Sequence, residues 1–213
     1  MAKDDITKSF KFIGTRPNRP DGFEKVTGRA KYGADISAVG MLHGAVLRSP
    51  YAHARIKSIN FEKAAKLDGV KAIITRDDFP KDREGEPLKL LENTIAGEIA
   101  YYDGHAIAAV AATSVFTAKE ALKEIEVEYE VLPHVIDVDD AMKPDAPIVR
   151  ENAGDFSVPE GSSPNVASYI EFGRGDIANG FDKADIVKSG LFKTEAAHQG
   201  YIEPHACMAQ LDH

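Results

Sequence analysis

The sequence predicts an α+β protein, and three adjacent segments carry that prediction. Residues 106–112 are apolar throughout, which indicates a strand covered on both faces in the centre of a sheet. Residues 117–125 show the spacing of an amphipathic helix. Residues 125–131 alternate apolar residues with glutamates, the pattern of a half-exposed strand, and Pro133 then ends it.

Shorter elements precede this region and alternate in type. Residues 80–98 are polar and broken by glycine and proline, so a loop is expected there. Thr117 and Glu120 match a capping box, so the helix is expected to begin at Thr117. The expected helix face consists of Ala118, Ala121, Leu122 and Ile125; the other expected elements are strands at 41–47, 55–59 and 70–75 and a helix at 61–67.

The composition changes after residue 142. Residues 143–165 contain four prolines, two glycines and three serines, which predicts a linker or a long surface crossing. Residues 1–20 are expected to form an arm, because Pro17 and Pro20 disfavour a helix. Beyond the linker the expected strands are 166–172, 186–192 and 202–211.

Charge and cysteine content exclude several classes of protein. The chain has 213 residues with 26 Lys and Arg against 34 Asp and Glu, a net charge of −8 that argues against nucleic acid and anionic membranes as partners. A single cysteine excludes an internal disulfide framework and a cluster held by four cysteines of this chain. The longest apolar run is far shorter than the roughly 20 residues of a membrane span, so a cytoplasmic protein is expected.

A glycine-rich segment is a candidate dinucleotide site. Residues 173–178 match the relaxed G-x-G-x-x-A pattern, with Glu195 about twenty residues later. The helix that follows has room only for residues 176–181, too few for the helical crossover that presents a helix N-terminus to a pyrophosphate. The favoured interpretation is a glycine turn with Asp176 as an N-cap.

Several polar residues are candidates for a chemical role. His198, Glu203 and His205 could ligate a metal, yet Pro204 prevents the shared helical face of an H-E-x-x-H site, and an interface role is favoured. Cys207 is more simply a small packed hydrophobe, and the acid pairs Asp77–Asp78 and Asp139–Asp140 are more simply helix N-caps. The remaining histidines are expected to be surface or hydrogen-bonded core residues; they are His43, His53, His105 and His134.

Taken together, these segments resemble the large, molybdenum-cofactor-binding subunit of the xanthine dehydrogenase and aldehyde oxidase family. Within that family the chain looks most similar to bacterial members of the 4-hydroxybenzoyl-CoA reductase kind. The matching motifs are 21–32 (DGFEKVTGRAKY), 42–56 (LHGAVLRSPYAHARI), 69–75 (GVKAIIT), 102–104 (YDG), 125–133 (IEVEYEVLP), 181–185 (FDKAD) and 198–205 (HQGYIEPH).

The resemblance implies an a/b hammerhead domain, a mixed sheet with packed helices, followed by the start of a molybdenum-cofactor-binding domain. The implied division is an arm at 1–20, the hammerhead domain at 21–142, a linker at 143–165 and the incomplete first cofactor domain at 166–213. The family's glycine-rich cofactor loop and catalytic glutamate would lie beyond His213. No residue here therefore inherits a catalytic, cofactor-binding or metal-binding role.

The implied function is that of an N-terminal portion or split subunit of a molybdenum hydroxylase. Such an enzyme oxidises an aldehyde, an N-heterocycle or an aromatic thioester, with its molybdopterin held mainly outside this chain. The implied partners are the remaining molybdopterin-binding polypeptide, an iron-sulfur subunit and an FAD subunit. The alternative is a non-catalytic scaffold that docks the iron-sulfur and FAD subunits through residues 1–20 and the stripe of Glu126, Glu128 and Glu130.

Overall fold

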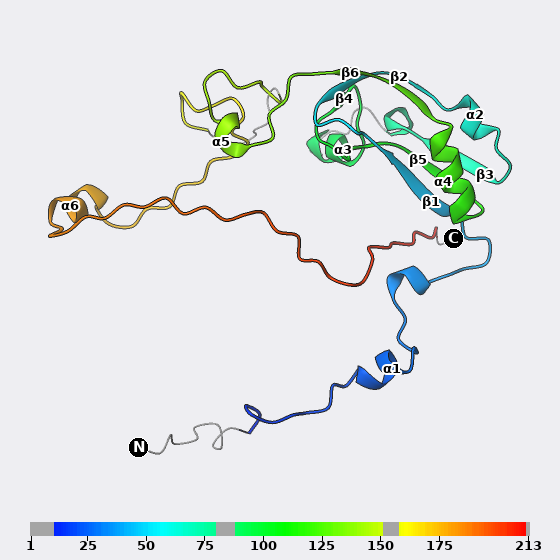
Figure 1. Cartoon of the computed structure of the whole chain (residues 1–213), viewed down its shortest axis with the longest axis horizontal. Helices are drawn as coiled ribbons and strands as arrows, with labels where there is room; N and C mark the ends of the chain where they lie inside the picture. The colour runs from blue at the N-terminus through cyan, green and yellow to red at the C-terminus, as the bar shows by residue number, and fades with distance from the viewer. Residues whose placement is uncertain (1–10, 80–87, 151–157, 212–213) are drawn as a thin grey trace. The chain divides into compact units, whose positions relative to one another are not determined.

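The computed structural model describes residues 11–79, 88–150 and 158–211 (Figure 1). The chain divides into two compact units. One comprises Gly40–Ser189 and contains both sheets; the other joins Met1–Val39 with Gly190–His213.

The first sheet has three antiparallel strands in the order β1-β5-β3. They are β1 (His43–Arg48), β5 (Ala106–Ala112) and β3 (Val70–Ile74). Ala109 of β5 lies opposite Val46 on one side and Ile74 on the other. The apolar run is therefore the central strand, as its composition predicts.

The second sheet is also antiparallel, in the order β4-β2-β6. It contains β4 (Ile99–Ala100), β2 (Ala54–Asn60) and β6 (Glu126–Val131). The fold is thus α+β as expected, but two small antiparallel sheets replace the expected single mixed sheet. The two-residue β4 was not predicted, because so short a strand shows no periodicity.

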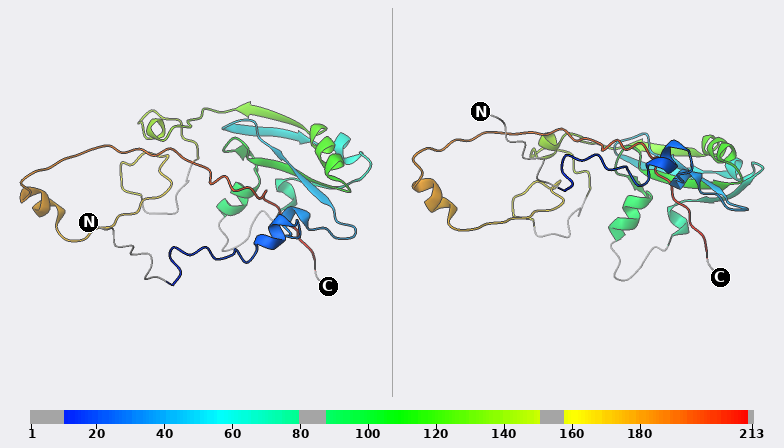
Figure 2. Two further views of the ribbon diagram at one scale, coloured as in Figure 1. Left: turned by 60° about the horizontal axis from the view of Figure 1, so that its bottom comes forward. Right: turned by 90° about the horizontal axis from the view of Figure 1, so that it is seen from below.

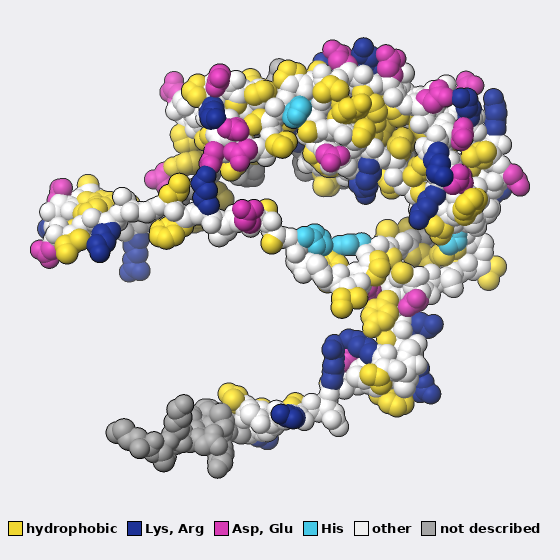
Figure 3. Space-filling view, in the orientation of Figure 1, with side chains coloured by type: hydrophobic (Ala, Val, Ile, Leu, Met, Phe, Trp, Pro, Cys, Tyr) yellow, Lys and Arg dark blue, Asp and Glu magenta, His cyan; other side chains and the backbone are white. Residues whose placement is uncertain are grey.

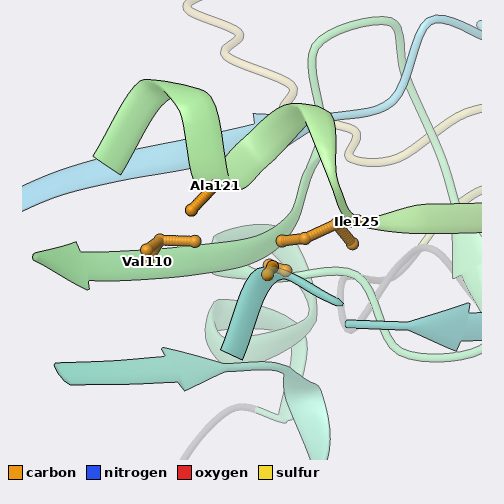
Figure 4. Close-up of a cluster of buried hydrophobic side chains, with 5 residues drawn as sticks. Val110, Ala121 and Ile125 are labelled. Atoms are coloured by element: carbon orange, nitrogen blue, oxygen red, sulfur yellow. The ribbon is translucent and has the colours of Figure 1, made fainter. Parts of the chain in front are cut away.

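Alanine allows the helices to pack closely on β5. Helix α4 (Val115–Lys123) contacts all three strands of the first sheet and α2 (Glu62–Ala65). Val110 points from β5 toward Ala121 of α4, with Ile125 beside them (Figure 4). Removing apolar side chains from water in this way is the main source of stability in a domain of this kind.

The opposite face of β5 is covered differently. Ile107 is completely buried and packs with Ala96 and Ala100. These alanines follow α3 (Leu88–Thr94), which lies across the strands from α4 (Figure 2). The loop expected at 80–98 is therefore wrong in part, since this range contains α3; residues 80–87 lie outside the described residues. The seven residues of α3 are too few to show a clear helical period, so the sequence pattern did not reveal this helix.

The helix caps differ from the expected ones. Ser114, three residues before Thr117, is the N-cap of α4, and its hydroxyl accepts a hydrogen bond from the Thr117 amide at 3.0 Å. The expected start at Thr117 is wrong because the helix begins two residues earlier, where Val115 and Phe116 give no sequence signal. The two acid pairs likewise lie within first turns rather than at N-caps. The caps are Thr75 for the 3-10 turn η3 (Arg76–Asp78) and Asp137 for α5 (Val138–Ala141).

Asn165 holds the proline-rich crossing in place. Its side-chain amide donates to the carbonyls of Ala141 and Pro147, at 3.1 and 3.0 Å, and its side-chain oxygen accepts from the Val149 amide at 3.0 Å. Ser163 also donates to Ala141. Side-chain hydrogen bonds thus join the two ends of the described part of residues 143–165.

The segments around and after this crossing carry little regular structure. Helix α6 (Ile177–Asp182) is capped by Asp176, whose carboxylate accepts from the Asn179 amide at 2.9 Å, as the N-cap interpretation predicts. The strands expected at 166–172, 186–192 and 202–211 do not form within the described residues, because no neighbouring strand pairs with them. Residues 11–20 form no helix or strand; helix α1 (Gly22–Val26) and the turn η2 (Gly33–Asp35) follow.

Within the described ranges, no helix is both long enough and apolar enough to cross a membrane.

We expect the substitution Ser114→Ala to lower the free energy of unfolding by about 1 kcal/mol, because the Thr117 amide loses its cap. Urea denaturation of the full chain measures this. Ser37→Ala, at an exposed loop position, is the control and should change the value by less than about 0.5 kcal/mol. Equal losses in the two variants would contradict the assignment of Ser114.

Candidate functional site

A cluster of rings and charged groups lies where α3 ends and β5 begins. We call His53, Tyr101, Tyr102, His105 and Arg150 the histidine–tyrosine cluster. Tyr102 stacks on His105 with ring centroids 4.3 Å apart, and Tyr101 lies between His53 and His105 at 6.1 and 6.3 Å. The turn at 101–104 brings these rings together, and Gly104 adopts a φ of 85° in it.

His105 is fully buried and bonded to the backbone through both ring nitrogens. The Tyr101 amide donates to Nδ1 at 3.2 Å, and Nε2 lies 2.8 Å from the Glu92 carbonyl. A carbonyl only accepts, so Nε2 carries the proton and Nδ1 does not. This arrangement requires the neutral imidazole.

The surroundings disfavour a charge on His105. Burial lowers the pKa of the imidazole from its ordinary 6.5, and the positive charge of Arg150 lowers it further. The hydrogen bond to the Glu92 carbonyl opposes both effects. The net direction of the pKa shift is downward.

Arg150 joins the crossing segment to α3. Its guanidinium lies 2.9 Å from a Glu92 carboxylate oxygen and 3.0 Å from the Asn93 side-chain oxygen, and it stacks over the Tyr101 ring at 4.4 Å. The Arg150 side chain is only 19% exposed. A planar guanidinium can make these three contacts at once, which an ammonium cannot.

His53 occupies the other end of the cluster. Its Nδ1 lies 2.7 Å from the Pro133 carbonyl and therefore donates to it. Its Nε2 is buried and has no hydrogen-bond partner among the described residues. His53 and His105 are thus hydrogen-bonded core histidines, as the sequence predicts, while His134 is exposed.

A groove of about 610 Å³ runs beside the cluster. Tyr101, Glu92 and Ala96 form part of its wall, and residues of β2 and of the turn after β3 form much of the rest. The remaining lining residues are Ile56, Lys57, Ser58, Ile59, Phe61, Thr75, Arg76, Asp77, Gly97, Glu98 and Ile99.

The other sequence candidates do not assemble into a site within the described ranges. Glu203 accepts from the Gly33 amide at 3.1 Å, whereas His205 contacts the Tyr201 hydroxyl and His198 accepts from the Gly200 amide. Nowhere in residues 11–79, 88–150 and 158–211 do three or more His, Cys, Asp or Glu gather in a way that could hold a metal ion. The described ranges therefore offer no side-chain cluster that could bind a metal ion directly.

Cys207 was expected to be a small packed hydrophobe, and that expectation is wrong. Its side chain is exposed. The apolar residues around it in the sequence are not packed into a core in the described part of the chain, because the expected strand at 202–211 has no neighbour.

The acidic stripe is paired with cations on the neighbouring strand and helix. Glu126 lies 2.6 Å from Lys63, Glu130 lies 3.6 Å from Arg55, and Glu128 lies 3.9 Å from Lys57. All six side chains are largely exposed, so each pair contributes little to stability. The pairs nevertheless offset the negative charge of this face of the second sheet.

Comparison with known proteins identifies the class to which this fold belongs. The family model "Aldehyde oxidase and xanthine dehydrogenase, a/b hammerhead domain" matches residues 27–133, about half of the chain. The chain belongs to this family. It is homologous to the N-terminal part of molybdenum hydroxylase large subunits.

The individual relatives include enzymes with different substrates in their names. The chain is 35% identical to "Carbon monoxide dehydrogenase large chain" of Hydrogenophaga pseudoflava over 85% of its length and 23% of that protein. It is 32% identical to "Nicotinate dehydrogenase large molybdopterin subunit" of Eubacterium barkeri over 96% of its length and 46% of that protein. The structure of the Cu,Mo-CO dehydrogenase matches 81% of the chain and 23% of its own, with a TM-score of 0.64 and 31% identity. The chain thus spans between about a quarter and a half of these proteins.

Sequence pattern did not single out Arg150, Glu92 or Tyr101. Arg150 is 58 residues from Glu92 along the chain and lies in a segment whose composition predicts only a linker. The YDG motif at 102–104 was the one available signal, because a glycine after two tyrosines and an aspartate predicts a tight turn.

The free energy of unfolding should decrease as the pH is lowered below 6.5. The unfolded chain takes up a proton on His105 in this range while the folded chain resists it, so acid favours the unfolded state. Urea denaturation at pH 7.5 and 5.0 measures the difference. We expect a smaller difference in His105→Gln, and the wild-type difference in the control His134→Gln; an unchanged difference in His105→Gln would contradict the assignment.

Proposed function

We propose that this chain is the N-terminal portion or a split subunit of a molybdenum hydroxylase large subunit and works inside a multi-subunit complex. The observation that carries the proposal is the family membership of a chain that spans only 23% and 46% of two curated relatives. The proposed division is an arm at 1–20, the hammerhead domain at 21–142, a linker at 143–165 and the start of a cofactor domain at 166–213.

Exposed apolar side chains in the last of these regions support assembly with more polypeptide. Phe172 and Phe192 are each 92% exposed, and Ile202 is 100% exposed. The segment around α6 presents hydrophobic side chains at its surface (Figure 3), and Ile177, Phe181 and Ile186 line an open hollow of about 420 Å³ there. Large apolar side chains exposed in this way often mark a surface that binds another protein, so a partner surface is expected to cover them.

The chemistry proposed for the complex comes from groups held outside the described residues. In the proposal, the remaining molybdopterin-binding polypeptide holds the molybdenum cofactor, and iron-sulfur and FAD subunits carry electrons away. The substrate class is an aldehyde, an N-heterocycle or an aromatic thioester. The residues of this chain supply the hammerhead fold and the surface on which the rest assembles.

Capture of the complex tests this proposal. The tagged full chain is purified from its source cell and examined by native mass spectrometry, metal analysis and flavin fluorescence. We expect molybdenum, iron and flavin together with a second polypeptide that carries a molybdopterin-binding sequence. Phe172→Asp with Phe192→Asp should reduce recovery of that polypeptide at least tenfold, whereas the exposed control Arg174→Asp should not.

Other outcomes separate the alternatives. A chain recovered alone and free of metal would overturn the proposal. Recovery of iron-sulfur and flavin subunits without molybdenum would favour the scaffold alternative.

The paired charges of the second sheet give the scaffold alternative its own test. The scaffold alternative predicts that the triple variant Glu126→Lys, Glu128→Lys, Glu130→Lys weakens binding to the iron-sulfur and FAD subunits at least tenfold. We expect instead a change in affinity of less than about twofold, because Arg55, Lys57 and Lys63 already offset the charges of these glutamates. Surface plasmon resonance measures the affinities, and the swapped pair Lys63→Glu with Glu126→Lys is the matched control.

A further inference from the structure

His105 joins three parts of the hammerhead domain that are separate in sequence. Its Nε2 donates to the Glu92 carbonyl in the last turns of α3, and its Nδ1 accepts from the Tyr101 amide in the 101–104 turn. Its own carbonyl accepts from the Ser49 amide at the end of β1, at 2.8 Å. The first two of these bonds depend on the imidazole ring.

Only the neutral ring can make both side-chain bonds. Protonation would place an N–H on Nδ1, directly opposite the N–H of Tyr101, so an acceptor would be replaced by a second donor. A buried donor without an acceptor is costly, and the complete burial of His105 keeps water from serving as that acceptor.

The charged groups around His105 do not compensate for a positive ring. Arg150 adds positive charge, and the Glu92 carboxylate is already bonded to Arg150. From the end of β1, the Arg48 guanidinium is held by the Gly104 carbonyl at 2.8 Å. Tyr101 separates His105 from His53, Tyr102 covers the ring face, and Asp103 is exposed in the turn.

We propose that His105 is an acid-sensitive latch whose protonation releases α3 and the 101–104 turn from one another. The release would also free Arg150, which is bonded to Glu92 and Asn93 of α3 and stacked on Tyr101. Glu92, Ala96 and Tyr101 all form the wall of the 610 Å³ groove, so the latch controls the shape of that groove. This inference concerns the hammerhead domain and Arg150 of the adjoining crossing segment, and it does not depend on the proposed function.

Hydrogen exchange of the full chain tests the latch between pH 7.5 and 4.5. After correction for intrinsic exchange, we expect protection of the Tyr101, Ile95 and Ala96 amides to fall at least tenfold with acid. These amides bond to His105 Nδ1, the Leu91 carbonyl and the Ala106 carbonyl. The Ala118 and Glu124 amides of the α4 region serve as internal references and should change less than twofold.

Three variants separate the latch from other causes. His105→Gln keeps a donor for the Glu92 carbonyl but cannot be protonated, so the loss of protection with acid should disappear. Arg150→Gln removes the positive charge that opposes protonation, so the midpoint should move to higher pH. Glu92→Gln removes the neighbouring carboxylate and should leave the loss of protection in place.

A measurement on the unaltered chain makes the test independent of the folding of any variant. The nitrogen-15 shifts of the His105 ring report its protonation directly, and their midpoint should coincide with that of the Tyr101 protection loss. Protection that stays constant while the ring titrates would overturn the proposal. So would a wild-type response in His105→Gln, or its disappearance in Glu92→Gln.

Discussion

The burial of β5 on both faces is the constraint on which the rest of the hammerhead domain depends. Ala108 and Val110 pack in one cluster with Ala121 of α4, while Ile107 packs with Ala96 in the chain that follows α3. A strand in this position can tolerate no polar side chain, and its alanines leave room for a helix at close range. Substitution by larger residues would separate the layers, since cores are packed as closely as crystals.

The two faces of β5 are held by different means. On the α4 side, apolar contact and a serine cap suffice, because the helix has a broad apolar face. On the other side, α3 and the 101–104 turn present polar backbone groups to the interior, and such groups need partners. The His105 ring is the hydrogen-bond partner of two of these backbone groups, the Glu92 carbonyl and the Tyr101 amide. Arg150 also bonds to the Glu92 and Asn93 side chains of α3. The polar cluster is therefore a consequence of the fold on that side of the sheet, and it makes that side sensitive to protonation.

The hammerhead domain and the 166–211 region differ in structure. The hammerhead domain has a defined core on both faces of β5. The 166–211 region has exposed phenylalanines and isoleucines and no strand pairing within the described residues, which is why we propose that a partner surface covers it. In the proposed complex, the first would supply the fold and the second the surface on which the remaining polypeptides assemble.

The sequence by itself determined the elements whose patterns are local and periodic. The apolar run of β5, the helix after it and the alternating β6 could all be predicted, since each buries a face that its own residues specify. The resemblance to the family also followed from sequence motifs, and the family match at 27–133 confirms it. The glycine turn capped by Asp176 was predictable because the cap lies three residues from its donor.

Only the tertiary structure decided the features that join distant residues. Helix α3 and strand β4 are too short to show a period. Ala100 of β4 packs with Ile107, and the Glu92 carbonyl of α3 accepts from His105. The cation partners of Glu126, Glu128 and Glu130 became known only when the register of β2 against β6 was fixed. The histidine–tyrosine cluster and its Glu92 partner join residues 53, 92, 101, 102, 105 and 150, and no spacing rule connects them. Physical contact across the fold, rather than any local preference of the chain, places these groups together.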